Sequence, residues 1–416
     1  MQKQDLTMVI KNHLPSQDMV EDILSELPAK SLVRFMSVCK PWHRLIRDDP
    51  AFKALHSRKT AASPARCHYL ARKWTCDSSS RTHTRFSMLH NGTPLMVEKP
   101  VFNPFSGSKG PDMFKIVGSH DGLVCILVLV DRADVFFRTP SIYLWNPSIN
   151  KVKPLKRFMY GGNNDVFGFG FSKESKEHRI VRVIDYFSKS RHRQRREVYV
   201  YSSGTDSWKE IGMVLSGLIR TELRFIVFQK PTILDGAPHW LACDRNLSSS
   251  QATVIISFNF DADRFGYTAI PARAVRTAGA YNYKVLGTLK GSLAFLDSLL
   301  DPISGYNEHE VWVLREYGVE SSWIKLFSFQ NTKMIDLAGF GIDGEVFLTS
   351  GRKAEMLVEV SDSGKVIRMM QGTSMMAEML VPYTESLVLL DHVDSCDGDD
   401  SIRKPPRKRG KFSSSN

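Results

Sequence analysis

Side chains that could carry out catalysis occur in this sequence only in incomplete patterns. Asp261 and Asp263 stand two residues apart, but they fall in a predicted hairpin turn, where aspartate commonly binds its own backbone. The run Glu308–Glu310, E-H-E, lacks the H-E-x-x-H spacing by which a helix presents two zinc ligands. The G-F-G of Gly168–Gly170 is too short for a dinucleotide-binding loop, and no G-x-S-x-G sequence occurs. These patterns favour a protein without an active site of its own, and a hydrolase stays open as an alternative.

The cysteines are too widely spaced for a zinc site or a disulfide framework. None forms a close pair such as C-x-x-C. We therefore predict no metal and no cofactor, and we expect a reducing compartment, the nucleus and/or the cytoplasm. The six cysteines are Cys39, Cys67, Cys76, Cys125, Cys243 and Cys396.

The composition is that of a soluble folded protein with room for one large and one small domain. Of the 416 residues, 42% are hydrophobic and 24% are charged. No segment approaches the roughly 18 consecutive apolar residues that indicate a membrane span, so we expect no membrane partner. The net charge of +12 suits acidic partners or nucleic acid. Much of it fits a solvated surface equally well, and we do not expect a nucleic-acid partner.

A strongly basic segment lies between strands predicted around Ile184 and Val198. Arginine side chains bind carboxylates and phosphates in a forked geometry, so this segment could hold an acidic target. The simpler alternative, which we favour, is a solvated hairpin loop. The five charges belong to Lys189, Arg191, Arg193, Arg195 and Arg196.

The C-terminal residues are poor in apolar side chains and are expected to be disordered. An acidic stretch over 391–400 is followed by a basic run that resembles a nuclear import signal. A tail that only improves solubility is the alternative. The basic residues are Arg403, Lys404, Arg407, Lys408, Arg409 and Lys411.

A segment of about 45 residues, Leu14–Arg58, has the periodicity of helices. We expect helices over residues 17–27 and 29–39. A third helix carries Trp42, and a fourth begins after Asp49, a suitable N-cap. The apolar residues of the second helix spread over roughly 220°, whereas a surface helix needs little more than 100°. Either a second protein or the rest of this chain must cover the excess.

Short strand patterns repeat from about residue 68 to 391. The unit is an apolar strand, a polar turn and a second apolar strand, and five anchor positions are separated by 56, 57, 54 and 45 residues. A period near 50 is typical of a kelch-like β-propeller, and we expect about six blades. The anchors are Trp145, Tyr201, Phe258, Trp312 and Leu357.

The ends of the repeat region should close the ring. His68–Phe105 would supply part of a further unit, and Glu385–Leu390 would add a strand that pairs with the first blade. Glycines such as Gly122 and Gly236 suit inner strands that are crowded at the axis. Five tryptophans are expected to pack within and between blades rather than to stack on a ligand. They are Trp145, Trp208, Trp240, Trp312 and Trp323.

The segment Leu14–Ile46 resembles an F-box of the plant type. Its sequence, L-P-S-Q-D-M-V-E-D-I-L-S-E-L-P-A-K-S-L-V-R-F-M-S-V-C-K-P-W-H-R-L-I, follows that family's pattern without a gap. Minor departures occur at Met19, Asp22 and Met36-Ser37. In that family the helices bind a Skp-type adaptor, which links them to a cullin. The resemblance implies adaptor contacts for Leu14, Pro15, Ile23, Leu24, Leu27, Pro28, Leu32, Val33, Val38, Cys39 and Trp42.

The repeat region resembles the F-box-associated domain that follows plant F-boxes. The matching phrases include L-W-N-P-S at Leu144, F-G-F-G-F at Phe167, H-W-L-A at His239 and Y-T-E-S-L-V-L-L at Tyr383. The resemblance implies a substrate-recognition subunit of a Skp-cullin-F-box (SCF) ubiquitin ligase, whose propeller binds an unidentified target protein. A propeller that binds partners outside any ligase is the alternative. The expected organisation is a flexible N-terminus (1–13), an F-box (14–58), a linker (59–67), a propeller (68–391) and a disordered tail (392–416).

Overall fold

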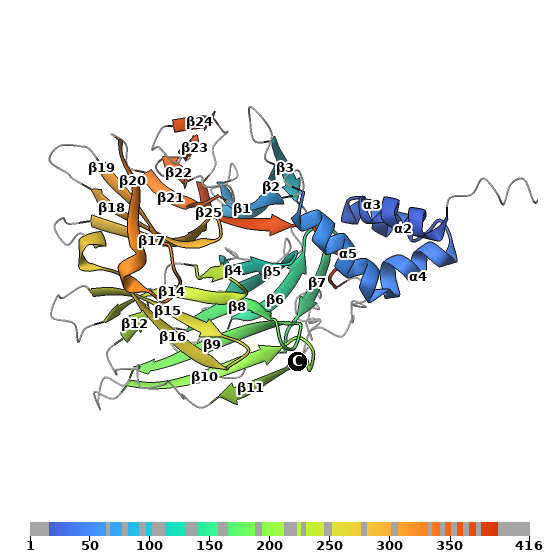
Figure 1. Ribbon diagram of the computed structural model, residues 1–416, viewed down its shortest axis with the longest axis horizontal. Coiled ribbons are helices and arrows are strands. Elements are labelled where there is room, and N and C mark those ends of the chain that lie inside the picture. Colours follow the sequence, from blue (N-terminus) through green and yellow to red (C-terminus); the bar gives the residue numbers. More distant parts are fainter. Residues whose placement is uncertain are drawn as a thin grey trace, which may run out of the picture.

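The computed structural model shows a group of helices at one end of a β-propeller (Figure 1). The predicted order, a small helical domain followed by a propeller, is confirmed. The structure describes residues 16–63, 67–76, 82–90, 97–101, 113–129, 140–156, 165–187, 194–211, 223–225, 230–244, 252–275, 281–300, 307–331, 335–341, 346–350, 356–360, 366–371 and 376–389.

Four helices precede the first strand in the described part of the chain. They are α2 (Gln17–Ser25), α3 (Ala29–Phe35), α4 (Lys40–Asp48) and α5 (Pro50–Ala61). The carboxylate of Asp49 accepts hydrogen bonds from the backbone N–H groups of Ala51 (2.7 Å) and Phe52 (3.1 Å). The predicted N-cap of the last helix is therefore confirmed, and it satisfies backbone donors that the helix itself cannot pair.

Helix α3 is shorter than predicted, because it ends at Phe35 rather than at residue 39. The backbone N–H groups of Ser37 and Val38 bond to carbonyls only three residues back, which tightens the chain into a turn. The Ser37 hydroxyl also donates to the Arg34 carbonyl at 2.7 Å and so competes with helical hydrogen bonding. Val38 and Cys39 consequently lie in the connection to α4.

The described strands form six antiparallel sheets around a common axis, five of four strands and one of five (Figure 1). The first holds β25 (Met376–Thr384), β1 (Cys67–Cys76), β2 (Thr82–His90) and β3 (Val97–Val101). The second holds β4 (Met113–His120), β5 (Leu123–Leu129), β6 (Ser141–Asn146) and β7 (Lys151–Pro154). The third holds β8 (Val166–Ser172), β9 (Glu177–Phe187), β10 (Gln194–Ser202) and β11 (Ser207–Ile211).

The remaining three sheets complete the ring. The fourth holds β12 (Leu223–Phe225), β13 (Thr232–Leu234), β14 (Ala237–Asp244), β15 (Ala252–Asn259) and β16 (Arg264–Ala269). The fifth holds β17 (Tyr281–Leu289), β18 (Ser292–Leu300), β19 (Asn307–Leu314) and β20 (Trp323–Asn331). The sixth holds β21 (Ile335–Phe340), β22 (Val346–Ser350), β23 (Met356–Val360) and β24 (Val366–Gln371). Two short 3-10 helices, η2 (Ala272–Ala274) and η3 (Glu320–Ser322), lie in loops.

The ring closes through β25, which pairs with β1 from Cys67 opposite Thr384 to Trp74 opposite Met376. The predicted closing strand, Glu385–Leu390, is wrong, because the closing strand ends immediately before it. The backbone carbonyl of Ser386 accepts a hydrogen bond from a side chain instead of from a neighbouring strand. Pairing with β25 covers the inner edge of β1 and joins the two ends of the propeller in one sheet.

Gly122 and Gly236 are crowded, as predicted, because an added Cβ would clash with Ser386 at the first and with the Phe171 carbonyl at the second. They lie in turns, however, and not within inner strands. Each is the second residue of a two-residue hairpin turn, with φ of 72° and 79°, which glycine adopts without strain. Within the inner strand β8, Gly168 is crowded as well, since an added Cβ would lie 2.7 Å from Pro238 of the next sheet.

The prediction that the tryptophans pack within the propeller is confirmed: four are buried, and Trp208 packs against the core beside Tyr201. Trp145, Trp240, Trp312 and Trp323 are buried, and Trp208 is half-buried. The indole N–H groups also tie sheets together: that of Trp240 donates to the carbonyl of Phe167 at 3.0 Å, and that of Trp323 to the carbonyl of Ala269 at 3.1 Å. These rings therefore hold adjacent blades together.

The helices are fixed to the propeller by the segment that follows β25. Leu387 is buried in the core of the helical domain, and Ile149 of the propeller packs against the same core. The carboxylate of Glu385 accepts a hydrogen bond from the first backbone N–H of α3, that of Ala29, at 3.1 Å. Helix α5 adds a bond of 2.7 Å from the Ser57 hydroxyl to Asp121. We call Glu385–Leu389 the junction segment.

The junction segment is held by a buried polar network. The side-chain amide of Asn146 donates to the carbonyls of Ser386 (3.0 Å) and Val388 (2.8 Å). Its oxygen accepts from the Tyr383 hydroxyl at 3.1 Å, and that hydroxyl also lies 2.6 Å from the Ser148 hydroxyl. Asn146 and Ser148 belong to the L-W-N-P-S phrase, so this motif has a structural role in holding the junction.

Candidate functional site

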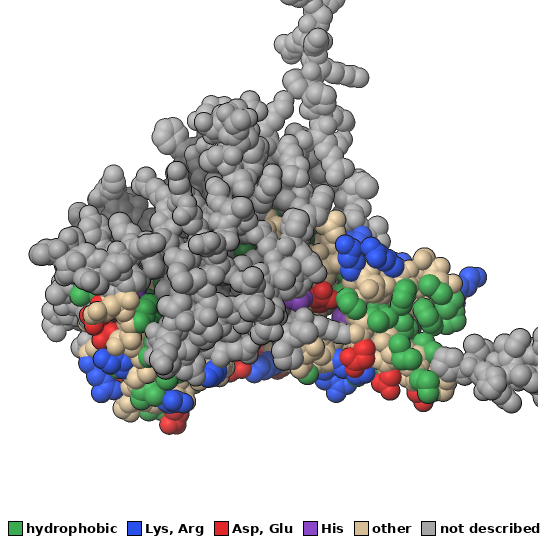
Figure 2. Space-filling view, turned by 90° about the horizontal axis from the view of Figure 1, so that it is seen from above, with side chains coloured by type: hydrophobic (Ala, Val, Ile, Leu, Met, Phe, Trp, Pro, Cys, Tyr) green, Lys and Arg blue, Asp and Glu red, His purple; other side chains and the backbone are tan. Residues whose placement is uncertain are grey.

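Large apolar side chains are exposed on the helical domain. Met19 and Ile23 are 55% exposed and stand four residues apart on one face of α2, and Val38 beyond α3 is 60% exposed. Figure 2 shows hydrophobic side chains gathered at the end of the molecule where the helices lie. Pro28 and Cys39 are exposed as well. We call Met19, Ile23, Pro28, Val38 and Cys39 the apolar face.

Other residues of the predicted adaptor-binding set face inward. Leu24 is 2% exposed and Leu32 is fully buried, so both form the core of the helical domain. Leu27, Val33 and Trp42 are half-buried at the edge of that core. Leu14 and Pro15 lie outside the described residues. The structure thus separates side chains that the F-box resemblance had grouped together as adaptor contacts.

The propeller covers one side of the helices and leaves the apolar face uncovered. The propeller side is occupied by Leu387 and Ile149, which pack on the core that contains Leu24 and Leu32. The explanation that the rest of the chain covers the apolar excess therefore holds for one part of it only. Large apolar side chains that are exposed together are typical of surfaces that partners bury.

An ion-pair cluster at the surface joins two of the helices. The ammonium of Lys59 in α5 lies 3.0 Å from Glu26 and 3.4 Å from Asp22, both at or near the end of α2. The hydrogen bond to Glu26 is the largest cause of the raised pKa of Lys59, opposed by desolvation. The cluster joins α2 to α5 without covering Met19 or Ile23.

The basic segment is only partly described, and two of its members, Arg195 and Arg196, were misplaced by the prediction, which put them in a loop. Arg196 is in strand β10, where its backbone pairs with Asp185, rather than in a loop. Its side chain is 8% exposed, and its guanidinium lies 5.9 Å from the centre of the Phe225 ring. The hairpin is tighter than expected because β9 runs to Phe187 and β10 begins at Gln194. Lys189, Arg191 and Arg193, and the side chain of Arg195, lie outside what is described.

The basic tail residues also lie outside the described part of the chain. These are Arg403, Lys404, Arg407, Lys408, Arg409 and Lys411.

The residues considered for catalysis make hydrogen bonds and packing contacts with other residues of the propeller. Asp261 accepts hydrogen bonds from the Ser172 hydroxyl (2.6 Å) and the Glu174 N–H (3.2 Å), and the Ser172 bond is the main reason that its pKa is lowered. His309 is buried, with Nδ1 2.7 Å from the Ser298 hydroxyl and its ring stacked on Phe329. Among the described residues, no group of three or more histidine, cysteine or acidic side chains is placed to hold a metal ion.

None of the described helices is long and apolar enough to cross a membrane.

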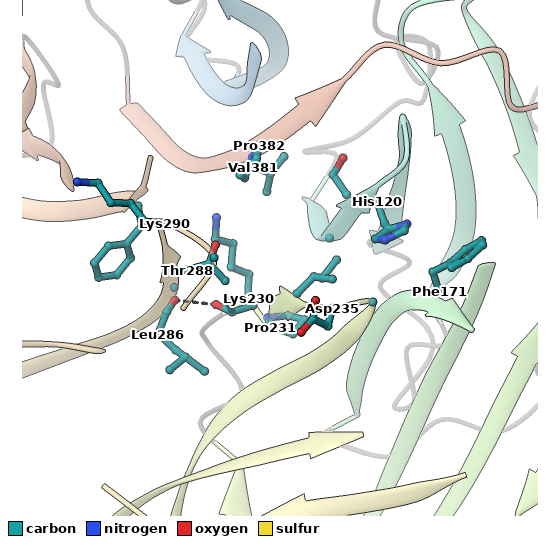
Figure 3. Close-up of a pocket in the computed structure, with 18 of the residues that line it drawn as sticks. His120, Phe171, Lys230, Pro231, Asp235, Leu286, Thr288, Lys290, Val381 and Pro382 are labelled. Atoms are coloured by element: carbon teal, nitrogen blue, oxygen red, sulfur yellow. Dashed lines mark hydrogen bonds between the residues drawn. The ribbon is translucent and has the colours of Figure 1, made fainter. Parts of the chain in front are cut away.

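The sequence did not reveal a cavity of about 460 Å³ on the propeller axis. Inner strands of all six sheets line it, and Figure 3 shows side chains from these strands converging on it. Its charged residues are Lys173, Lys230, Lys290 and Asp235, and His120 lies on its wall. No sequence signal groups residues that are separated by more than 100 positions, so only the closed ring brings them together.

Comparison with known proteins finds two matching family models. The model of the F-box domain matches residues 16–53, and that of the F-box associated beta propeller domain matches residues 78–390. The chain is 28% identical to the F-box/kelch-repeat protein At3g23880 of Arabidopsis thaliana over 77% of this chain and 80% of that protein. It is 23% identical to the F-box protein CPR1 of the same plant over 92% and 89%.

A solved structure with a similar fold is the GH93 α-L-arabinofuranosidase of Fusarium graminearum. It is 11% identical, covers 66% of this chain and 86% of its own, and has a TM-score of 0.38. A likeness of that size carries no argument about activity.

Proposed function

Because this chain belongs to the plant-type F-box proteins that carry an F-box-associated β-propeller domain, we propose that it is a substrate-receptor subunit of an SCF ubiquitin ligase. In this proposal the helices bind a Skp-type adaptor, which links the chain to a cullin, and the propeller binds a target protein. The observation that carries the proposal is the apolar face, which the chain's own propeller leaves exposed.

The proposed mechanism is proximity. The receptor holds a target lysine near the ubiquitin-charged partner and so converts a bimolecular encounter into a nearly intramolecular one. A rigid connection between helices and propeller favours this mechanism, because a fixed geometry raises the effective concentration of the lysine. The junction segment supplies such a connection. The chain needs no nucleophile of its own, and we propose that it is not an enzyme.

The proposal is tested by co-purification with a Skp-type adaptor. Wild-type chain should form a one-to-one complex, and Ile23→Asp with Val38→Asp should abolish it, because a carboxylate would have to be desolvated at the interface. The matched control is Ile324→Asp with Val319→Asp, which alters two propeller side chains that are also exposed. An undiminished complex with the first pair, or no complex with wild type, contradicts the proposal. The latter result favours a propeller interaction protein outside any ligase.

We further propose that the basic run from Arg403 to Lys411 directs the chain to the nucleus. The alternative is that the chain stays in the cytoplasm. A fluorescent fusion that ends at Ser401 should lose nuclear enrichment. An unchanged distribution leaves the tail with a solubilising role only.

We also propose that the part of the basic segment at Arg191, Arg193 and Arg195 contributes to target binding. Affinity capture under proteasome inhibition should recover fewer proteins when the three arginines are changed to glutamate. Equal recovery would show that this hairpin is only a solvated loop.

A further inference from the structure

The helices that carry the apolar face have charges of opposite sign at its two edges. Residues 17–26, which form α2 and its C-cap, contain four carboxylates and no lysine or arginine. Residues 29–48, which form α3, α4 and the connection between them, contain five lysines and arginines and one aspartate. A surface whose charges serve only solubility usually mixes both signs. The separation on this domain therefore calls for another explanation.

The cations of α3 and α4 point away from the core of the helical domain. Lys30 and Arg34 stand four residues apart and share one face of α3, and both are exposed. Leu32 between them is fully buried, because two residues along a helix turn the side chain by about 200°. On α4, exposed side chains again stand four residues apart, at Lys40 and Arg44. We call Lys30, Arg34, Lys40 and Arg44 the basic edge.

The basic edge borders the apolar face. Val38 and Cys39, which are exposed members of that face, lie along the chain between Arg34 of α3 and Lys40 of α4. Helices α3 and α4 contact each other, so their cations belong to one side of the domain. Figure 2 shows lysine and arginine side chains beside the hydrophobic side chains at the end where the helices lie. A partner that covers the apolar face therefore meets these cations as well.

The carboxylates of α2 lie at the other edge. Asp18 and Asp22 are exposed and stand four residues apart, and each precedes an apolar-face residue, Met19 or Ile23. The acidic stripe is thus rotated by about 100° from the apolar one. Lys59 of α5 lies 3.4 Å from Asp22, which places the stripe on the side of α2 that faces α5. The apolar face separates the two signs of charge.

From this separation we infer that the adaptor presents an acidic surface to the basic edge, and that this pairing sets the orientation in which the adaptor sits on the apolar face. The inference rests on the proposed function, because it concerns the partner of the same face. Apolar burial is non-directional and does not fix an orientation by itself. An adaptor turned around would bring its acidic surface against Asp18 and Asp22, where like charges repel.

The basic edge should act on the rate of association more than on the affinity. Exposed ion pairs add little to a binding free energy, because both partners are well solvated when they are apart. Attraction over a longer distance instead steers the two proteins together, and dissolved salt screens it. A dependence of the association rate on salt is therefore the signature of the proposed pairing.

The test measures association of the full-length chain with a purified plant Skp-type adaptor by stopped-flow fluorescence. At about 50 mM NaCl, Lys30→Glu with Arg34→Glu should slow association roughly tenfold or more, and about 500 mM NaCl should remove most of the difference. The matched control is Lys209→Glu with Arg264→Glu, which makes the same change of charge on the exposed strands β11 and β16. That control should associate at nearly the rate of wild type.

The acidic edge provides a second comparison. Asp18→Asn with Asp22→Asn should not slow association, because these carboxylates do not meet the acidic surface of the adaptor in the proposed orientation. The variant keeps the 3.0 Å ion pair between Glu26 and Lys59, which still joins α2 to α5. Slowing as great as that caused by the change at Lys30 and Arg34 would overturn the inference.

The outcomes separate this inference from the proposed function. A complex that forms at the same rate in every variant, or at a rate independent of salt, overturns the inference alone. No complex with wild type contradicts the proposed function itself. Should Lys30→Glu with Arg34→Glu fold poorly in thermal unfolding, Lys30→Gln with Arg34→Gln replaces it. That pair should slow association about threefold, since it removes half as much charge, and an unchanged rate counts against the pairing.

Discussion

The helical domain and the propeller handle apolar surface in opposite ways. In the propeller, each sheet packs against its neighbours and the last strand closes the ring, so most of its large described side chains are buried. The four helices bury one side against Leu387 and Ile149 and leave Met19, Ile23 and Val38 exposed. A closed ring pairs its first strand with its last. A helical unit of about 45 residues has too small a core of its own and depends on neighbours for burial. The comparison identifies the helices as the part of the chain that is built for a partner.

The largest effect is expected from opening the propeller core. Trp145 is fully buried in the core that joins the first two sheets, and its ring lies 5.0 Å from that of Phe86. Trp145→Ala should lower the free energy of unfolding by about 3–5 kcal/mol, because it removes a large ring from a packed core. Urea denaturation measures the change. A loss below about 1 kcal/mol would mean that the closed ring is less tightly packed than its burial indicates.

A smaller effect is expected where the two regions meet. Leu387→Ala should cost about 2–3 kcal/mol, since its side chain is buried but lies at the edge of the helical core. Hydrogen exchange should show faster exchange in α3 than in β4 or β8. The control, Leu387→Met, keeps the volume and should change little. Equal loss of protection in both regions would show that the junction segment does not act locally.

The buried histidines of the propeller should make its stability depend on pH. Burial lowers the pKa of His239 to about 4, and its Nε2 is 2.8 Å from the Tyr317 hydroxyl. His178 has a similar pKa, also through burial. The unfolded chain takes up protons below about pH 6.5 and the folded chain does not, so stability falls between about pH 6.5 and 4 by roughly 1.4 kcal/mol per pH unit for each group.

His239→Gln should reduce the slope of the unfolding free energy against pH by the contribution of one histidine, roughly 1.4 kcal/mol per pH unit. Chemical denaturation at pH 7 and pH 5 measures the slope for the variant and for wild type. A slope that is unchanged by the substitution would mean that His239 is already protonated in the folded state.

The smallest effect on stability is expected on the apolar face. Ile23→Ala with Val38→Ala should change the free energy of unfolding by no more than about 0.5–1 kcal/mol, because both side chains are exposed. The neighbouring Leu24→Ala should cost about 2–5 kcal/mol, because that side chain is buried. Thermal unfolding of the isolated chain compares the two. A similar cost for both variants would show that the face is covered by this chain.

Periodicity predicted the type of each region well but not the inward or outward position of single residues. Ile23 and Leu24 are adjacent apolar residues that the pattern could not separate, and only packing against α3, α5 and Leu387 decides that Leu24 is inside. Arg196 was grouped with a charged loop by its neighbours, yet strand pairing buries it beside Phe225. Local sequence specifies local conformation, whereas burial depends on residues that are distant in the chain.

The sequence alone determined the helical segment, the repeated strands and the N-cap at Asp49, because each of these rests on residues close together in the chain. Tertiary structure alone decided how the ring closes, which residue fixes the helices and where the axial cavity lies. Leu387 enters the helical core, and residues such as Lys230 and Thr288 come to line one cavity, only after the ring has closed. Contacts across such long separations follow from the topology of the closed ring, which no local pattern encodes.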